Sequence, residues 1–168
     1  RVDKAILAEC REGLIALSGC LSGEAPSLLA QGREEEARNV LAGYRDLFGP
    51  SNFFVELQRH DLPQERKVLE GLDRLARELG LPTVATNDVH YLREEDAHAH
   101  EVLLCINTGK LMSDPDRLRL ESEDFYLKSP AEMAEAFAGR EEALRSTLAI
   151  AERCSSPLRF HEKHLPRF

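Results

Sequence analysis

The sequence predicts an α/β protein in which short parallel strands alternate with amphipathic helices. Compact apolar or β-branched runs that are typical of buried strands occur at residues 14–18, 53–57 and 83–85. The two segments between these runs carry apolar residues at the i, i+3, i+4 spacing of helices with one buried face. A strand–helix–strand–helix–strand order implies parallel strands that are joined by right-handed crossovers.

Composition limits the class of protein. The 168 residues are 42% hydrophobic and 31% charged, which indicates a globular chain rather than a disordered one. No apolar run approaches the roughly 20 residues of a membrane-spanning helix, and no signal peptide opens the chain. Four widely spaced cysteines without a CxxC pair predict reduced thiols, so we expect a cytoplasmic location without membrane contact.

Charge and the start of the chain add two expectations. The net charge of −8 argues against a general nucleic-acid-binding face, because such faces are usually basic. The negative net charge is compatible with a pocket that binds cations. The chain begins at Arg1 within a helical pattern that ends near Cys10, and we therefore expect a piece of a longer protein.

The crossover helices have recognisable ends. We expect residues 22–24 to form a loop and the first crossover helix to bury its stripe over about residues 37–48. Asp61 is expected to cap the second helix, with Pro63 and Gln64 in its first turn and a buried stripe over residues 68–79. Gly80 is expected to end this helix before the third strand.

The pattern changes after Tyr91. Residues 94–107 predict a helix that buries Val102, Leu103 and Ile106, and residues 109–123 predict an irregular segment. A short strand at 125–127 and two short helices at about 130–138 and 140–154 are expected next, with Ser129 and Glu132 forming a capping box. The tail from residue 155 to 168 has no periodicity.

Polar residues crowd the end of the third predicted strand. Asp88 and His90 are two positions apart, and in a strand such residues point to the same face. A carboxylate and an imidazole placed in this way can converge on one metal ion. The alternative is that Asp88 caps the next loop and His90 packs beside Tyr91.

The other two strands also end in candidate groups. Cys20 follows the Gly19 turn and is either a zinc thiolate or a small buried side chain. Glu56 lies on a predicted buried strand, where a carboxylate needs a metal or a salt bridge. His60 either contacts substrate or lies on a loop. His98 and His100 point to different faces of a predicted helix and do not form a ligand pair.

Six stretches of this sequence resemble the bacterial DNA polymerase III alpha subunit family, in and beyond its polymerase-and-histidinol-phosphatase (PHP) domain. They occur in the order of that family and together cover most of the chain: GLIALSGCLSGE (13–24), FFVELQRH (53–60), ATNDVHYL (85–92), DAHAHE (96–101), CINTGK (105–110) and FYLKSPAEM (125–133).

The resemblance implies a fold and a metal centre. The fold is a portion of a (β/α)₇ PHP-type distorted TIM barrel followed by short C-terminal helices, with residues 1–108 in the late barrel and 109–168 leading toward the polymerase core. The cofactor is a cluster of divalent ions, zinc or else magnesium or manganese. By position Cys20, Asp88 and His90 match metal ligands, Glu56 matches a pocket carboxylate, and His60 and Asn87 are supporting catalytic candidates.

The resemblance also implies a function. The full subunit is a DNA-directed DNA polymerase whose magnesium-dependent site lies outside this chain, and its PHP domain is a metal-dependent phosphoesterase or 3′–5′ exonuclease. Expected partners are DNA and the proofreading, clamp and clamp-loader subunits. The family's HxH motif of the early strands is missing from the start of the chain, so the isolated chain is expected to be inactive.

The sequence leaves two alternatives to a catalytic PHP domain. One is a non-catalytic scaffold that braces the polymerase and docks a proofreading or clamp-loader subunit. The other, a stand-alone phosphatase of the same superfamily, is disfavoured by residues 96–133, which resemble the polymerase subunit specifically.

Overall fold

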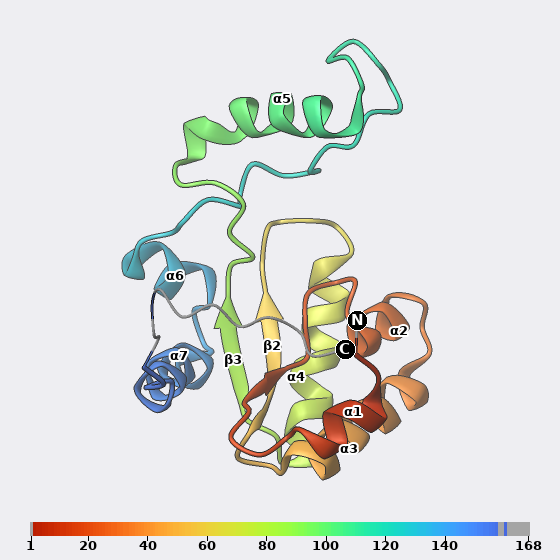
Figure 1. Cartoon of the computed structure of the whole chain (residues 1–168), viewed down its shortest axis with the longest axis vertical. Coiled ribbons are helices and arrows are strands. Elements are labelled where there is room, and N and C mark those ends of the chain that lie inside the picture. The colour runs from red at the N-terminus through yellow and green to blue at the C-terminus, as the bar shows by residue number, and fades with distance from the viewer. Residues whose placement is uncertain (1, 158–159, 161–168) are drawn as a thin grey trace.

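Three parallel strands form the sheet of this protein, seen here in a computed structural model that describes residues 2–157 and 160. The strands β1 (Ala16–Leu17), β2 (Phe53–Gln58) and β3 (Thr83–Thr86) lie side by side in the order β1-β2-β3. Ala16 is opposite Phe53, and Glu56 is opposite Val84. The predicted neighbouring parallel strands are confirmed (Figure 1). The sheet is consistent with a portion of a PHP-type barrel, and a closed barrel of seven strands is not seen in the described residues.

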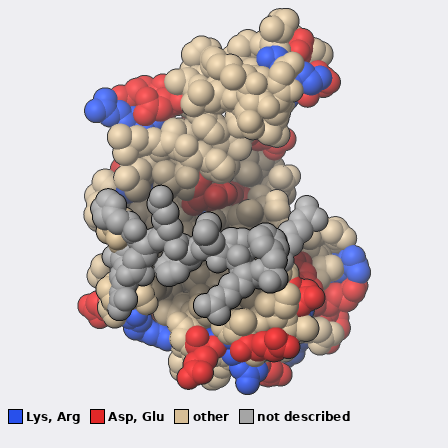
Figure 2. Space-filling view, in the orientation of Figure 1, with Lys and Arg blue, Asp and Glu red and all other residues tan. Residues whose placement is uncertain are grey.

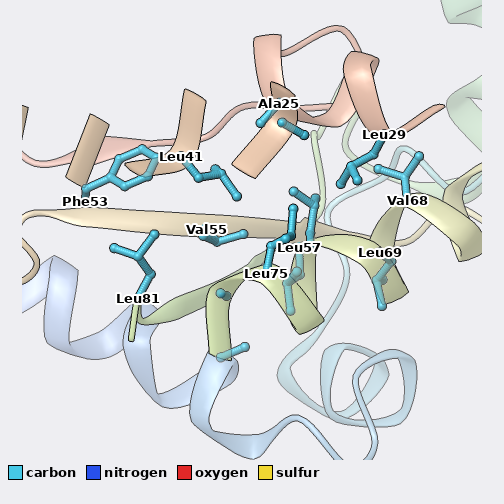
Figure 3. Packing of buried hydrophobic residues seen from close by; sticks show 14 of the residues in the cluster. Ala25, Leu29, Leu41, Phe53, Val55, Leu57, Val68, Leu69, Leu75 and Leu81 are labelled. Atoms are coloured by element: carbon cyan, nitrogen blue, oxygen red, sulfur yellow. The ribbon is translucent and has the colours of Figure 1, made fainter. Parts of the chain in front are cut away.

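Helices pack around the sheet, and two of them carry the apolar stripes that were predicted over residues 37–48 and 68–79. Helices α2 (Glu24–Ala30), α3 (Glu34–Phe48) and α4 (Glu65–Leu79) pack with β2 around one core. Figure 3 shows Leu41 on one side of the strand, with Leu57 and Leu75 meeting beside it. Removal of this apolar surface from water is the main stabilising contribution to the fold. Helix α7 (Glu141–Arg153) packs against β3, the last strand in the sheet order.

Helix α2 was not predicted, because a loop was expected at residues 22–24 and no helix was assigned between this loop and the stripe over residues 37–48. The helix starts directly after Gly23, and its buried face carries Ala25 and Leu29. Gly23 makes this start possible. A Cβ at position 23 would lie 2.5 Å from the carbonyl oxygen of Ser18, a distance that side chains do not tolerate.

The predicted start of α4 was also wrong in detail. Gln64 is the N-cap residue and makes no capping bond through its side chain. Asp61, the expected cap, lies in a left-handed turn with φ of 54°. Glu65, the first helical residue, instead turns its carboxylate back toward the strand exit, where it accepts from the backbone amides of His60 and Leu62 in the preceding loop.

The segment after β3 departs most from the prediction. A short 3₁₀ turn, η1 (Glu94–Asp96), leads into α5 (Ala97–Thr108), which lies beyond the carboxyl end of the sheet (Figure 1). The expected burial of Val102, Leu103 and Ile106 is wrong: Leu103 is 61% exposed and Ile106 72% exposed. Helical periodicity identified an apolar face, but no described element packs over it as a core would.

The C-terminal part follows the prediction closely. Residues 125–127 form one parallel bridge, Tyr91 to Tyr126, rather than a full strand. Ser129 and Glu132 form the predicted capping box at the start of α6 (Pro130–Ala136). Helix α1 (Lys4–Glu9) is present at the other end. The expected irregular tail lies partly outside the described residues.

The remaining expectations concern membranes and thiols. None of the described helices has the length and apolar character that a membrane crossing requires. All four cysteines are free thiols, and Cys105 alone is buried.

Candidate metal centre at the carboxyl end of the sheet

The predicted site residues lie near or just beyond the carboxyl ends of the three parallel strands, which share one end of the sheet, with Glu56 inside β2 itself. In α/β proteins this end is where catalytic and binding residues gather. Figure 2 shows acidic atoms set back in a recess between the α5 part and the body below it. On the same face lysine and arginine are interspersed with acidic residues and form no continuous basic surface.

Asp88 and His90 approach each other as predicted, but for a different reason. Asp88 Oδ1 lies 3.7 Å from His90 Nε2, and their side chains are 38% and 39% exposed. The strand ends at Thr86, so strand alternation does not place them. Asp88 instead adopts a left-handed conformation with φ of 44°, a turn that brings the two side chains together. The pair can share a cation that approaches from solvent.

Asn87 is a buried residue that directly precedes this pair. Its Nδ2 donates to the carbonyls of Asp124 at 3.3 Å and Tyr126 at 2.5 Å. These two acceptors fix which way the amide points. Its Oδ1 is then buried without a hydrogen-bond partner among the described residues. A buried orphan acceptor is costly, and such atoms often mark a functional position.

His60 is fully buried and does not face a substrate. Its Nδ1 lies 2.6 Å from Glu65 Oε1, and its Nε2 lies 2.7 Å from the carbonyl oxygen of Asn87. Both neighbours are acceptors, so both ring nitrogens need protons when Glu65 is ionised. Burial acts to lower the pKa of His60, but the hydrogen bonds to Glu65 and Asn87 outweigh it and raise that pKa above 6.5.

Glu65 is a site residue that the sequence analysis missed. It is only 4% exposed, although it is the first residue of a helix that begins on the surface. Its Oε2 accepts from the backbone amide of His60 at 2.5 Å, which makes a second link to the same residue. The sequence does contain a signal for this contact: Glu65 lies in the first turn of a predicted helix, five residues after a histidine, where a carboxylate can bond to the preceding loop.

Glu56 connects two strand exits. Its Oε2 accepts from the amide of Gly19 at 3.1 Å, and its Oε1 accepts from Thr86 Oγ1 at 2.5 Å and from Gln58 Nε2 at 3.3 Å. These partners are neutral donors, so the salt-bridge interpretation of Glu56 does not describe its contacts. The carboxylate links the turn that carries Cys20 to the end of β3.

Cys20 is half-buried and shares a cavity of about 10 Å³ with Glu56 and Glu65. Among residues 2–157 and 160, no three His, Cys, Asp or Glu side chains converge as a metal-binding group. The structure therefore brings Asp88 and His90 together but does not add Cys20 to them. The assignment of all three as ligands stays a prediction.

His100 is a further neighbour of this site. Its ring packs edge-on to His90, with centroids 5.6 Å apart, and lies 5.4 Å from the ring of Tyr91. Tyr91 and His100 line a cavity of about 540 Å³ together with Arg117 and Arg119. Sequence spacing gave no signal for this contact, since His90 and His100 lie on separate elements.

The fold and these strand-end residues fit the PHP class, and comparison with protein families matches residues 1–60 to the PHP domain. Over most of its length the chain is similar to DNA polymerase III alpha subunits. The identity is 50% to that of Treponema pallidum over 92% of the chain, 45% to that of Mycobacterium tuberculosis over 93%, and 43% to that of Thermus aquaticus over 100%.

The chain is therefore homologous to the DNA polymerase III alpha subunit, as the sequence motifs predicted. It spans only 13% of the length of the Treponema pallidum and Mycobacterium tuberculosis proteins and 14% of the Thermus aquaticus protein.

Proposed function

We propose that this chain is part of the catalytic alpha subunit of a cytoplasmic replicative DNA polymerase III, and that its PHP region carries a metal-dependent phosphoesterase site. The observation that carries the proposal is the approach of Asp88 and His90, at 3.7 Å, directly beyond the end of β3. Homology to alpha subunits supports the polymerase context. In that context the substrate is the 3′ end of a DNA strand, and the activity is a 3′–5′ exonuclease.

The residues present suit part of a divalent-cation site. Asp88 and His90 supply a carboxylate and an imidazole, which zinc accepts as donors, and the thiol of Cys20 is proposed as a third donor that the described structure does not bring to this pair. When bound, the cation activates water and neutralises phosphate charge. Magnesium or manganese are alternatives at this site, and the polymerase magnesium belongs to another part of the subunit.

The cavity beside the pair is suited to a nucleotide. Its volume of about 540 Å³ is within the range of small-molecule sites. The rings of Tyr91 and His100 offer surfaces on which a base can stack. In this proposal the cavity holds the terminal nucleotide while Asp88 and His90 hold the ion.

A scaffold is the second candidate function, and the exposed face of α5 favours it. Leu103 and Ile106 lie open on a helix that projects beyond the sheet. Exposed apolar faces of this kind mark contacts with another protein surface. In this alternative the region braces the polymerase and docks a proofreading or clamp-loader subunit without hydrolysing DNA.

Metal content of the full-length subunit tests the catalytic proposal. We expect Asp88→Asn and His90→Ala to lower the bound metal and to reduce 3′-end hydrolysis at least tenfold, because each removes a ligand. Asp116→Asn is the matched control, since that exposed carboxylate pairs only with Lys110 in the described residues. Polymerase activity reports whether each variant is folded.

Two results would reject the catalytic proposal. One is unchanged metal content and hydrolysis in both variants. The other is a wild-type subunit that binds no metal. If Leu103→Glu also abolishes binding of a partner subunit, the scaffold function is favoured.

A further inference from the structure

We propose that the buried His60–Glu65 pair is the positioning element of the Asp88–His90 site, acting through the peptide bond between Asn87 and Asp88. This inference rests on the proposed metal site. His60 and Glu65 are 1% and 4% exposed, so neither can act on a substrate directly. A buried imidazole and a buried carboxylate are costly unless they are fully hydrogen-bonded. Here both ring nitrogens of His60 and both carboxylate oxygens of Glu65 have a hydrogen-bond partner.

The first contact holds a peptide plane. His60 Nε2 donates to the carbonyl oxygen of Asn87 at 2.7 Å. That carbonyl belongs to the same rigid plane as the backbone amide of Asp88. Holding the oxygen restricts rotation of the plane and thereby holds the φ of Asp88 at 44°. Aspartate rarely adopts this left-handed conformation without support, so the bond keeps the Asp88 carboxylate aimed toward His90.

The second contact holds the other side of the turn. The ring of His60 stacks on Phe125, with centroids 4.1 Å apart and planes 12° apart. The carbonyl of Phe125 accepts from the amide of His90 at 2.8 Å, and its ring meets the edge of the His90 ring at 5.4 Å. One buried imidazole therefore touches both supports of the turn, the Asn87 carbonyl before Asp88 and the Phe125 residue that holds His90.

Glu65 fixes the imidazole itself. Its Oε1 accepts from His60 Nδ1 at 2.6 Å, while its Oε2 accepts from the backbone amides of His60 at 2.5 Å and Leu62 at 3.4 Å. The carboxylate thus fixes both the rotation of the imidazole ring and the conformation of the loop that carries it. Because Glu65 is the first residue of the fifteen-residue helix α4, the pair is anchored in the rigid part of the fold.

The test uses the full-length subunit, with Co²⁺ as the spectroscopic probe of the site. We expect His60→Ala to weaken Co²⁺ binding about 10- to 100-fold, the usual effect of losing a residue that orients a ligand. Its Co²⁺ absorption spectrum should change as well. His60→Gln should recover part of the affinity, because an amide can donate to the Asn87 carbonyl. Glu65→Gln should weaken binding, whereas Glu70→Gln, an exposed carboxylate on the same helix, should not.

Amide hydrogen exchange separates positioning from general stability. In the His60→Ala variant we expect faster exchange in peptides covering residues 86–92 and 124–127, and unchanged exchange in residues 37–48 of α3. Faster exchange throughout, or Co²⁺ affinity within twofold of wild type, would overturn the proposal. If Asp88→Asn leaves Co²⁺ binding intact, the proposed metal site fails, and localised exchange at residues 86–92 still decides whether the pair holds this turn.

Discussion

Replacing Glu56 by alanine should loosen the two strand exits that its carboxylate connects. The change removes the acceptor for the Gly19 amide at 3.1 Å and for Thr86 Oγ1 at 2.5 Å. Thr86 Oγ1 still accepts from Gln58 Nε2, but its hydroxyl loses its acceptor, so the Gly19 bond and the Thr86 bond are both lost. A hydrogen bond to a charged group contributes about 1.5–3 kcal/mol, and partial exposure of Glu56 places the expected loss near 2 kcal/mol.

Hydrogen exchange measures this loss locally in the full-length subunit. A loss of about 2 kcal/mol corresponds to roughly 30-fold faster exchange in peptides covering residues 16–20 and 83–88, if these open locally. Glu70→Ala is the control, because its exposed ion pair with Arg66 contributes little and should change exchange by less than about twofold. Exchange in the Glu56→Ala variant that matches the control would refute the idea that this carboxylate ties the strand ends together.

Three further predictions follow from the same contacts. The raised pKa of His60 gives a stabilisation that is fully present below pH 6.5 and is lost as pH rises through the folded-state value. After correction for the intrinsic exchange rate, amide exchange at residues 86–92 should therefore accelerate more steeply with pH in wild type than in His60→Gln. Equal slopes in the two proteins would contradict this prediction. Ser129→Ala should cost about 1 kcal/mol and speed exchange in α6 about fivefold, against no change for Ser146→Ala. The isolated chain of residues 1–168 should self-associate through α5, and Leu103→Glu with Ile106→Lys should reduce its mass in light scattering; a monomeric wild type would disprove this.

Local sequence patterns were enough for most of the framework. The apolar runs and the helical stripes between them identified three strands, and their alternation implied parallel pairing, because crossovers return each strand in the same direction. The Ser129 capping box was readable because its two hydrogen bonds join residues three positions apart. Helix α2 was missed because its short apolar pattern follows a Gly-containing segment that also suits a loop.

The site depended much more on tertiary structure. The sequence determined that Asp88, His90 and Cys20 follow parallel strands, and that Glu56 lies on the strand between them. Only the folded chain decided that Asp88 turns into a left-handed conformation, and that His60 is buried against Glu65 and the Asn87 carbonyl. It also decided that the apolar face of α5 is open. Hydrogen bonds such as His60 to Asn87 join residues 27 positions apart, and no helical or strand period encodes a contact of that range.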